Sequence, residues 1–220
     1  NRPDLLWALK GAGQYFGLVT ELTLQAYPIS ILRSDDGTLW TGTFIFDVGK
    51  VESVVSAAAT LMDNEDHNSV NLVVVTLNLQ TGTPCLLVMC LSFGSTAEAE
   101  EYTAPMKAIG PVVAMENRKK YSEINDGMDG FCAKGGFKLF KLMGATRFDP
   151  EPWAEVANIF VDLKERCPDV VSGGYGFKWV TGKQKEAGMD SSGHMRRLSL
   201  GCMCISFHPS QSDESLREES

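Results

Sequence analysis

The residues best suited to bind a ligand are the glycines near the start of the chain. Gly11, Gly13 and Gly17 lie within one short segment, Gly11-Ala12-Gly13-Gln14-Tyr15-Phe16-Gly17. Glycine has no Cβ, so backbone N–H groups in such a segment can closely approach a phosphate or a ring carbonyl. A tight turn that needs positive φ would use the same residue type. The segment therefore predicts either a ligand-binding loop or a structural turn.

The elements that flank these glycines exclude the dinucleotide-binding fingerprint. That motif has a strand before its glycines and a helix after them. Here the order is reversed. Residues 1–9 have the apolar spacing of a short helix that Gly11 ends, and residues 18–27 alternate as in a strand that Pro28 ends. The sequence therefore predicts a helix–loop–strand unit.

This unit resembles part of a known family. The pattern is similar to the closing segment of the flavin domain in berberine-bridge-enzyme-like oxidases, and it consists of Asn1-x-Pro3-Asp4-Leu5-Leu6-Trp7-Ala8-Leu9-Lys10-Gly11-Ala12-Gly13, then Phe16-Gly17-Leu18-Val19-Thr20, Leu22-Thr23-Leu24 and Tyr27-Pro28. These are FAD-linked oxidoreductases of the vanillyl-alcohol-oxidase type, with a PCMH-type FAD-binding domain. The resemblance implies FAD as cofactor. It also implies a set of residues that line FAD: Gly11, Gly13, Gln14, Tyr15, Phe16, Gly17, Leu18 and Val19.

The rest of the chain resembles the same family in layout only. The order of helices and hairpins is similar to the substrate-binding domain, in which an antiparallel sheet roofs the flavin ring. The resemblance implies that residues 1–29 close an FAD-binding domain, 30–210 form a substrate-binding domain and 211–220 form a truncated polar tail. The family's pyrophosphate loop, flavin-tethering residues and C-terminal tyrosine motif are not in this sequence. We therefore expect a piece of a longer enzyme, and no catalytic residue is assigned.

Beyond residue 37 the hydrophobic pattern predicts the α+β class. Helices are expected over residues 51–62, 97–109 and 151–167. Strands are expected over residues 39–46, 71–79, 85–93, 112–116, 137–146, 175–180 and 198–207. Hairpin-paired strands interspersed with helices favour an antiparallel sheet with helices packed on one face, rather than a doubly wound sheet. No internal repeat at a fixed period is visible.

Alternation along residues 71–79 assigns two faces to this strand. One is uniformly apolar and is expected to pack under the helices: Val73, Val75, Leu77 and Leu79. The other carries Thr76 and Asn78 and is the predicted substrate side. Tyr175, Phe177 and Trp179 share one face of a later strand. That aromatic face could lie against a flat ring, with Tyr175 and Trp179 touching substrate, or it could pack in the core.

Composition excludes several other classes. The net charge of −8 and pI of about 4.9 argue against a nucleic-acid partner. No apolar run approaches the ~20 residues that span a bilayer, so no membrane partner is expected. No cysteine or histidine set has metal-ligand spacing, and most of the six cysteines are interpreted as buried hydrophobic residues. His67, His194 and His208 are isolated and are interpreted as surface residues. Nothing in the sequence indicates a compartment.

With the resemblance, the sequence predicts an FAD-dependent oxidoreductase of the oxidase type. A hydride would pass from a small-molecule substrate to flavin N5, and O2 would reoxidise the flavin. The chain alone is expected to be inactive. The alternative is a non-catalytic α+β ligand-binding module whose glycine loop is structural.

Overall fold

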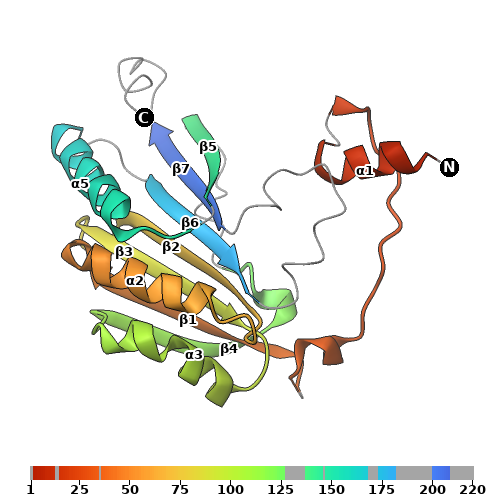
Figure 1. Ribbon diagram of the computed structural model, residues 1–220, viewed down its shortest axis with the longest axis horizontal. Coiled ribbons are helices and arrows are strands. Elements are labelled where there is room, and N and C mark those ends of the chain that lie inside the picture. Colours follow the sequence, from red (N-terminus) through yellow and green to blue (C-terminus); the bar gives the residue numbers. More distant parts are fainter. Residues whose placement is uncertain are drawn as a thin grey trace.

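The architecture is one antiparallel sheet with helices on one side. The computed structural model describes residues 2–12, 15–34, 36–126, 137–145, 147–167, 173–181 and 200–208. Seven strands are arranged in the order β4-β1-β3-β2-β6-β7-β5, and every neighbouring pair is antiparallel. Three helices, α2 (Val51–Met62), α3 (Thr96–Ala108) and α5 (Pro150–Arg166), cover one face (Figure 1). The predicted α+β fold class is confirmed.

The strand bounds agree with the sequence patterns to within about three residues, with one exception. The strands are β1 (Thr38–Asp47), β2 (Ser69–Leu77), β3 (Pro84–Ser92), β4 (Val113–Lys120), β5 (Phe137–Ala145), β6 (Gly174–Val180) and β7 (Leu200–His208). The exception is β4, which continues four residues past the predicted end at Glu116, through Asn117-Arg118-Lys119-Lys120. Among the described strands β4 pairs with β1 alone, so it is an edge strand of the sheet, and charged residues are compatible with such a strand.

The sheet consists of two units with the same local topology. In the first, β1-α2-β2-β3-α3-β4, the strands lie in the order β4-β1-β3-β2, which is the split βαββαβ arrangement. The second unit, β5-α5-β6-β7, has the order β5-β7-β6 and so repeats β1-α2-β2-β3. The units meet where β2 pairs with β6, and there α2 contacts α5 (Figure 1). The two units share one topology, although the sequence shows no repeat at a fixed period.

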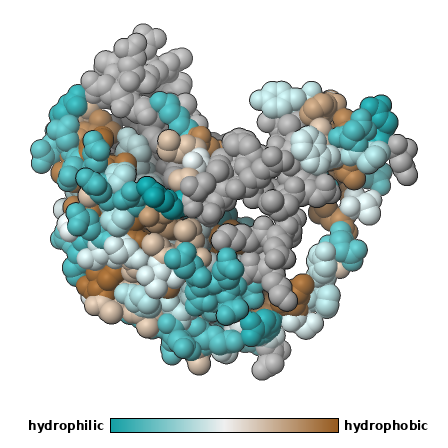
Figure 2. All heavy atoms as spheres, in the orientation of Figure 1, coloured by the Kyte–Doolittle hydropathy of each residue, from teal (hydrophilic) through white to brown (hydrophobic). Residues whose placement is uncertain are grey.

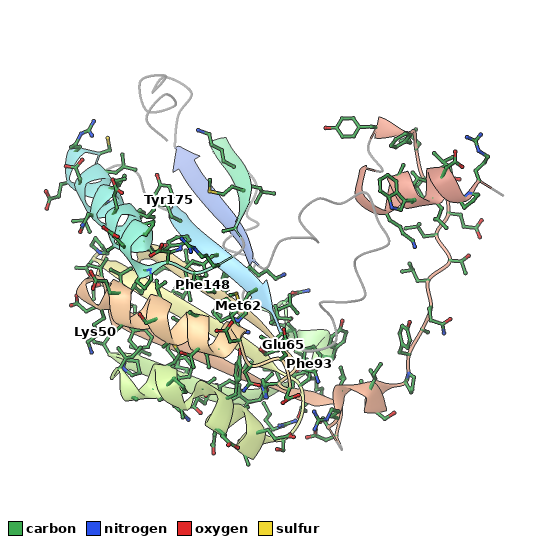
Figure 3. The ribbon with its side chains drawn as sticks, in the orientation of Figure 1. Lys50, Met62, Glu65, Phe93, Phe148 and Tyr175 are labelled. Atoms are coloured by element: carbon green, nitrogen blue, oxygen red, sulfur yellow. The ribbon has the colours of Figure 1, made fainter. Side chains whose placement is uncertain are left out.

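The hydrophobic core lies between the sheet and the three helices. Its largest fully buried side chains are aromatic: Trp40, Phe44, Phe46, Phe177 and Trp179. Phe148 lies between α5 and β6 (Figure 3), and its ring meets that of Phe177 edge-on at a centroid distance of 4.3 Å. On β2, Val73, Val75 and Leu77 face this core as predicted, so the assignment of the strand's two faces is confirmed.

Leu79 departs from the predicted apolar face. It follows the end of β2 and is 83 % exposed in the hairpin that leads to β3. The alternation that places Leu77 in the core holds only while the chain is extended and paired, and β2 ends at Leu77.

The N-terminal segment lies apart from the sheet (Figure 1). Helix α1 (Pro3–Ala12) begins at Pro3, as a first-turn proline should, and continues one residue past Gly11, where it was predicted to end. The predicted strand over residues 18–27 is wrong, because these residues are extended but pair with no strand in the described part of the chain. A strand needs a partner for its backbone groups.

The side chains of this extended segment are exposed. Leu18 is 97 % exposed and Leu24 is 80 % exposed, and apolar atoms stand among hydrophilic ones along the segment (Figure 2). The short 3-10 helix η2 (Ile29–Leu32) then leads towards β1, while η3 (Val48–Lys50) and η4 (Tyr121–Glu123) follow β1 and β4. None of the described helices is long and apolar enough to cross a membrane.

Candidate functional site

The face of the sheet opposite the helices is an apolar surface. Strand alternation places on it the side chains that do not enter the core, and they are half-buried: Thr41, Thr43 and Ile45 of β1, Leu72, Val74 and Thr76 of β2, and Leu87, Met89 and Leu91 of β3. The strand register pairs Met89 with both Thr43 and Leu72. We call these nine residues the open face, because the described helices α2, α3 and α5 all lie on the other side (Figure 1).

Strand β6 extends this surface with glycines. Gly174 and Gly176 have the same orientation as Val74, to which Gly176 is paired. A Cβ on Gly174 would lie 2.7 Å from a methyl carbon of Val74 and 2.9 Å from the carbonyl oxygen of Val75. A Cβ on Gly176 would lie 2.9 Å from the Val73 carbonyl oxygen. Because neither glycine has a Cβ, the side chain of Val74 can pack directly over the backbone of β6. On the same side of β6, Lys178 is exposed and contributes a positive charge.

Two of the predicted substrate residues, Thr76 and Asn78, are two positions apart in sequence but have different surroundings. Thr76 lies on the open face, as predicted, and its hydroxyl donates to the Gly173 carbonyl oxygen over 3.0 Å. Asn78 lies beyond β2 and builds the hairpin. Its N–H donates to the Thr83 carbonyl oxygen over 2.8 Å, and its Oδ1 accepts from the Gln80 N–H over 2.9 Å. Asn78 thus has a structural role in the turn.

Tyr175 and Trp179 are on the opposite side of the sheet from Thr76. The register pairs Tyr175 with Val75, and Trp179 with Asn71, so both face the helices. Trp179 is 1 % exposed, and its ring lies 5.4 Å from that of Phe148. Of the two interpretations of this aromatic face, core packing is therefore the one that the structure supports. The expectation that Trp179 touches substrate is not supported, because its buried indole has no surface to offer. Tyr175 is half-buried on the same helix side, with its ring 6.1 Å from that of Phe160.

The glycine-rich segment is described in part. Gly11 belongs to the last turn of α1, and Gly13 and Gln14 lie outside the described residues. Gly17 has a φ of 128°, a backbone conformation that residues with a side chain rarely adopt, so this position favours glycine. The neighbouring side chains are exposed: Tyr15, Phe16, Leu18 and Val19. Residues 15–19 and the open face are not brought together in this structure (Figure 1).

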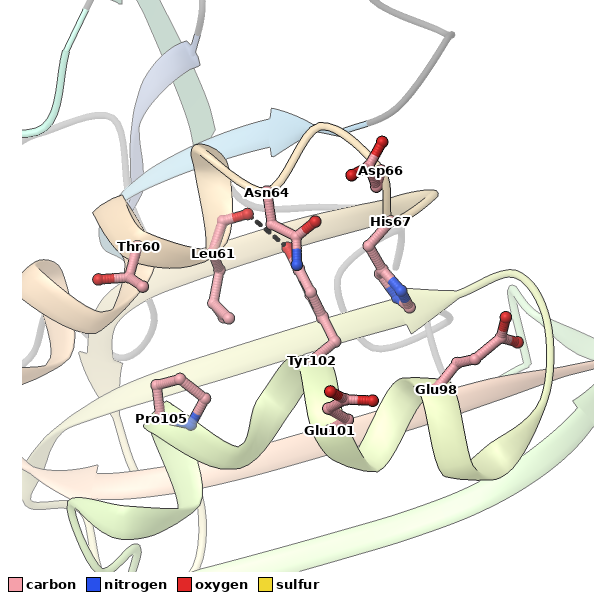
Figure 4. Close-up of a pocket in the computed structure, with 9 residues that line it drawn as sticks. All are labelled: Thr60, Leu61, Asn64, Asp66, His67, Glu98, Glu101, Tyr102 and Pro105. Carbon is pink, nitrogen blue, oxygen red and sulfur yellow. Dashed lines mark hydrogen bonds between the residues drawn. The ribbon is translucent and has the colours of Figure 1, made fainter.

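A polar cluster on the helix side was missed by the sequence interpretation. The ring of His67 stacks on Tyr102 of α3 at a centroid distance of 4.1 Å, and its Nε2 lies 2.8 Å from the Ser92 hydroxyl. The Tyr102 hydroxyl donates to the Leu61 carbonyl oxygen over 3.2 Å (Figure 4). It also accepts from the Asn71 amide over 3.1 Å. His67 is therefore half-buried rather than a solvated surface residue. The sequence feature that could have revealed this cluster is Asn71, a polar residue at an inward-facing position of β2.

This cluster borders a hollow of about 450 Å³. The residues that line it come from α2, α3 and the loop after α2: Thr60, Leu61, Asn64, Asp66, His67, Glu98, Glu101, Tyr102 and Pro105 (Figure 4). Burial lowers the pKa of His67, although the negative charge of Glu98 opposes the shift. Burial also raises the pKa of Tyr102. The two rings are already engaged in contacts that stabilise the fold, so we assign the hollow no chemistry.

Buried thiols give no sign of redox or metal chemistry in the described residues. Burial raises the pKa of Cys85 to about 11 and that of Cys90 to about 12, so both remain protonated at neutral pH. The interpretation of these two cysteines as buried hydrophobic residues is confirmed. No group of histidine, cysteine and carboxylate side chains within the described ranges could hold a metal ion. His194 lies outside those ranges.

Comparison with known proteins connects the chain to a class of flavoenzymes. No family model matches the sequence. The chain is 22 % identical over 165 residues to FAD-linked oxidoreductase fmqD of Aspergillus fumigatus, an alignment that covers 75 % of this chain and 32 % of that protein. It is 25 % identical over 171 residues to FAD-linked oxidoreductase hasG of Aspergillus fumigatus, covering 76 % and 34 %. This chain is a relative of the FAD-linked oxidoreductases. It spans about a third of the length of these two proteins.

Solved structures show that the fold of the chain is similar to part of several known proteins. BBE-like 1 of Physcomitrella patens matches all of the chain with a TM-score of 0.69 at 10 % identity, over 48 % of its own length. The 6-hydroxy-D-nicotine oxidase of Arthrobacter nicotinovorans matches 99 % of the chain with a TM-score of 0.62 at 18 % identity, over 47 % of its length. Xylooligosaccharide oxidase of Myceliophthora thermophila matches all of the chain with a TM-score of 0.62 at 15 % identity, over 48 % of its length. The resemblance drawn from residues 1–28 is confirmed.

Proposed function

We propose that this chain is part of an FAD-dependent oxidoreductase of the oxidase type that acts on a small organic molecule. In this proposal residues 1–29 close the FAD-binding domain and residues 30–210 form the substrate-binding domain. The observation that carries it is the open face, an apolar sheet surface that the described helices leave uncovered, in a chain related to FAD-linked oxidoreductases. Bound FAD would accept a hydride from a substrate C–H at N5 and pass the electron pair to O2.

The residues present fit a flavin in two respects. Gly17 takes a φ of 128°, and the side chains on either side of it are exposed, so the backbone of residues 15–19 is accessible to a ligand. Backbone groups of Gly11, Gly13, Gln14, Tyr15, Phe16, Gly17, Leu18 and Val19 would line FAD. The glycines of β6 have no side chains, and the side chains of β2 and β3 on this side are half-buried. The open face is therefore a shallow, apolar surface, which suits a planar ring.

The open face would also limit what kind of substrate is accepted. Its side chains are aliphatic or threonine, with Lys178 as the charge that β6 supplies. Such a surface excludes water from a reacting C–H and favours a largely apolar organic substrate. The Thr76 hydroxyl is already bound to Gly173, so it would present mainly its methyl group.

The direct test is to express the full-length protein and record its visible spectrum and its release of hydrogen peroxide with a panel of organic substrates. We expect a yellow protein with flavin bands and peroxide release with at least one substrate. A folded, colourless full-length protein that releases no peroxide would instead support the alternative, a non-catalytic α+β ligand-binding module whose glycine loop is structural.

A paired substitution tests whether the open face is the substrate side. Met89→Glu places a carboxylate at the centre of the open face, where burial against a cofactor or substrate would be costly. We expect flavin to remain bound and turnover to fall by about tenfold or more. Ile159→Glu adds the same charge at a half-exposed position of α5, on the helix side, and should leave turnover unchanged. Equal activity in both variants would contradict the assignment of this face.

A further inference from the structure

A single arginine of the edge strand β4 holds the turn through which the chain enters β1. The guanidinium of Arg118 donates twice to Thr38, from Nε to the hydroxyl over 2.7 Å and from Nη2 to the carbonyl oxygen over 2.9 Å. Nη2 also donates to the Ser34 hydroxyl over 3.1 Å. Nη1 donates to the Gly94 carbonyl oxygen over 3.2 Å and to the Thr96 hydroxyl over 3.3 Å. Arg118 therefore joins the turn at residues 34–38 to the turn before α3.

The turn itself is tightly ordered around one carboxylate. Oδ1 of Asp36 accepts from the Ser34 hydroxyl over 2.7 Å, from the Thr38 hydroxyl over 2.6 Å and from the Thr38 N–H over 3.0 Å. These hydrogen bonds, those from Thr38 first, hold the pKa of Asp36 well below its usual range. Ser34 and Thr38 donate to Asp36 and accept from Arg118, so the carboxylate and the guanidinium share the same two hydroxyl groups.

Two further contacts extend this order to the chain on the N-terminal side. Arg33 pairs with Glu98 of α3 over 2.8 Å, and Glu98 forms a capping box with Ser95 at the start of that helix. Ile29 of η2 approaches Gly37 so closely that a Cβ on Gly37 would lie 3.0 Å from its Cγ1. These contacts fix the direction in which residues 29–33 leave the sheet, relative to α3 and β4.

We propose that Arg118 is a positioning residue that sets the direction in which the chain leaves the sheet towards the FAD-lining segment. This rests on the proposed function, in which residues 15–19 contact FAD and the open face contacts substrate. The two surfaces lie in different parts of the chain, residues 20–40 connect them, and Arg118 holds the C-terminal part of this connection. Arg118 contacts neither surface, so it acts through the junction. These contacts require an arginine, because its planar guanidinium group can donate five hydrogen bonds to acceptors that lie in different directions.

The experiment compares Arg118→Lys and Arg118→Met with wild type in the full-length protein, with Arg166→Met as a control. Arg166 is an exposed arginine of α5 that pairs with Asp162 over 3.3 Å, remote from the junction. Lysine keeps the charge at position 118 but offers three donors from one atom. The readouts are the visible circular dichroism of bound flavin, the far-ultraviolet circular dichroism and the rate of flavin reduction by a substrate from the peroxide panel.

We expect Arg118→Lys to fold, to bind flavin and to change the visible circular dichroism, while the rate of flavin reduction falls about 10- to 100-fold, as for misplaced reacting groups. Arg118→Met should do the same or lose folding, and Arg166→Met should match wild type. A merely structural role would lower the melting temperature and leave the flavin spectrum and reduction rate of the folded protein unchanged, which would overturn the inference. A colourless wild-type protein would instead overturn the proposed function.

Discussion

Gly42 offers a sharp test of the packing between the sheet and the helices. It lies in the middle of β1, where glycine is normally unfavourable, and the rings of Trp40 and Phe44 close over it. Both rings are fully buried. A Cβ at Gly42 would lie 2.7 Å from Cζ3 of Trp40 and 3.0 Å from Cε2 of Phe44, with the Trp40 Cη2 nearer still. The added methyl would therefore overlap atoms that have no free space into which to move.

The magnitude follows from two opposing effects. Overpacking a well-packed core by one methyl costs about 1–3 kcal/mol. Replacing glycine in a strand returns about 0.5–1 kcal/mol of backbone entropy. We therefore expect Gly42→Ala to lower the free energy of unfolding by about 1–2 kcal/mol. Equilibrium unfolding in urea, followed by the fluorescence of the four tryptophans, measures this difference as a lower midpoint with an unchanged slope.

A second glycine and a second substitution make the test specific. At Gly49 a Cβ would meet only the Asp47 carboxylate at 3.4 Å, an ordinary contact, so Gly49→Ala should stay within about 0.5 kcal/mol of wild type. Trp40→Phe removes the part of the indole that meets the new methyl, so the double variant should be more stable than the sum of the single effects predicts, by about 1 kcal/mol. Additive effects, or a harmless Gly42→Ala, would refute the reasoning.

Three further predictions concern polar groups on the helix side. Burial lowers the pKa of His67 from its ordinary value of 6.5, which disfavours protonation in the folded state. The unfolding free energy should therefore be highest above pH 6.5 and fall as the pH decreases below it, and His67→Gln should flatten this fall in urea titrations at several pH values. Lys50→Met removes an ammonium that donates to the Ile109 carbonyl oxygen over 2.8 Å after α3, and should cost about 1–2 kcal/mol, measured as a lower melting temperature. Tyr102→Phe leaves the buried Asn71 amide without one acceptor and should cost about 1–3 kcal/mol in urea unfolding; an unchanged midpoint would contradict the hydrogen bond.

Local patterns were sufficient for most of the fold. Alternation of apolar and polar residues along residues 71–77 assigned both faces of β2, because one buried face imposes a period of two. The apolar stripes of α2 and α5, and the Ser95 cap of α3, located the helices that cover the sheet. The fold class could therefore be predicted without coordinates, whereas the relationship to flavoenzymes was predicted from the resemblance of residues 1–28 to a known flavin-domain segment.

What the sequence could not supply was pairing between distant segments. Alternation shows that Tyr175 and Trp179 share a face, but their side of the sheet is set by the register with Val75 and Asn71, about a hundred residues earlier. His67 looked exposed because Tyr102, which stacks on it, comes from a different element. The residues 18–27 have a strand pattern but no partner strand in the described chain. In each case the deciding contact is long-range.

The meeting of the two topological units at β2 and β6 has a consequence for the order in which the domain folds. Residues 38–120 contain every partner of β1, β3 and β4, together with α2 and α3, so the first unit can form its contacts as soon as β4 has been synthesised. Until β6 pairs with β2, the backbone N–H and C=O groups along the outer edge of β2 have no strand partner and can pair with another extended segment. The second unit then grows outward from this edge, β6 first and β7 and β5 after it. Amide hydrogen exchange should accordingly be slowest in β1 and β3 and fastest in β5, at the end of the sheet farthest from the first unit.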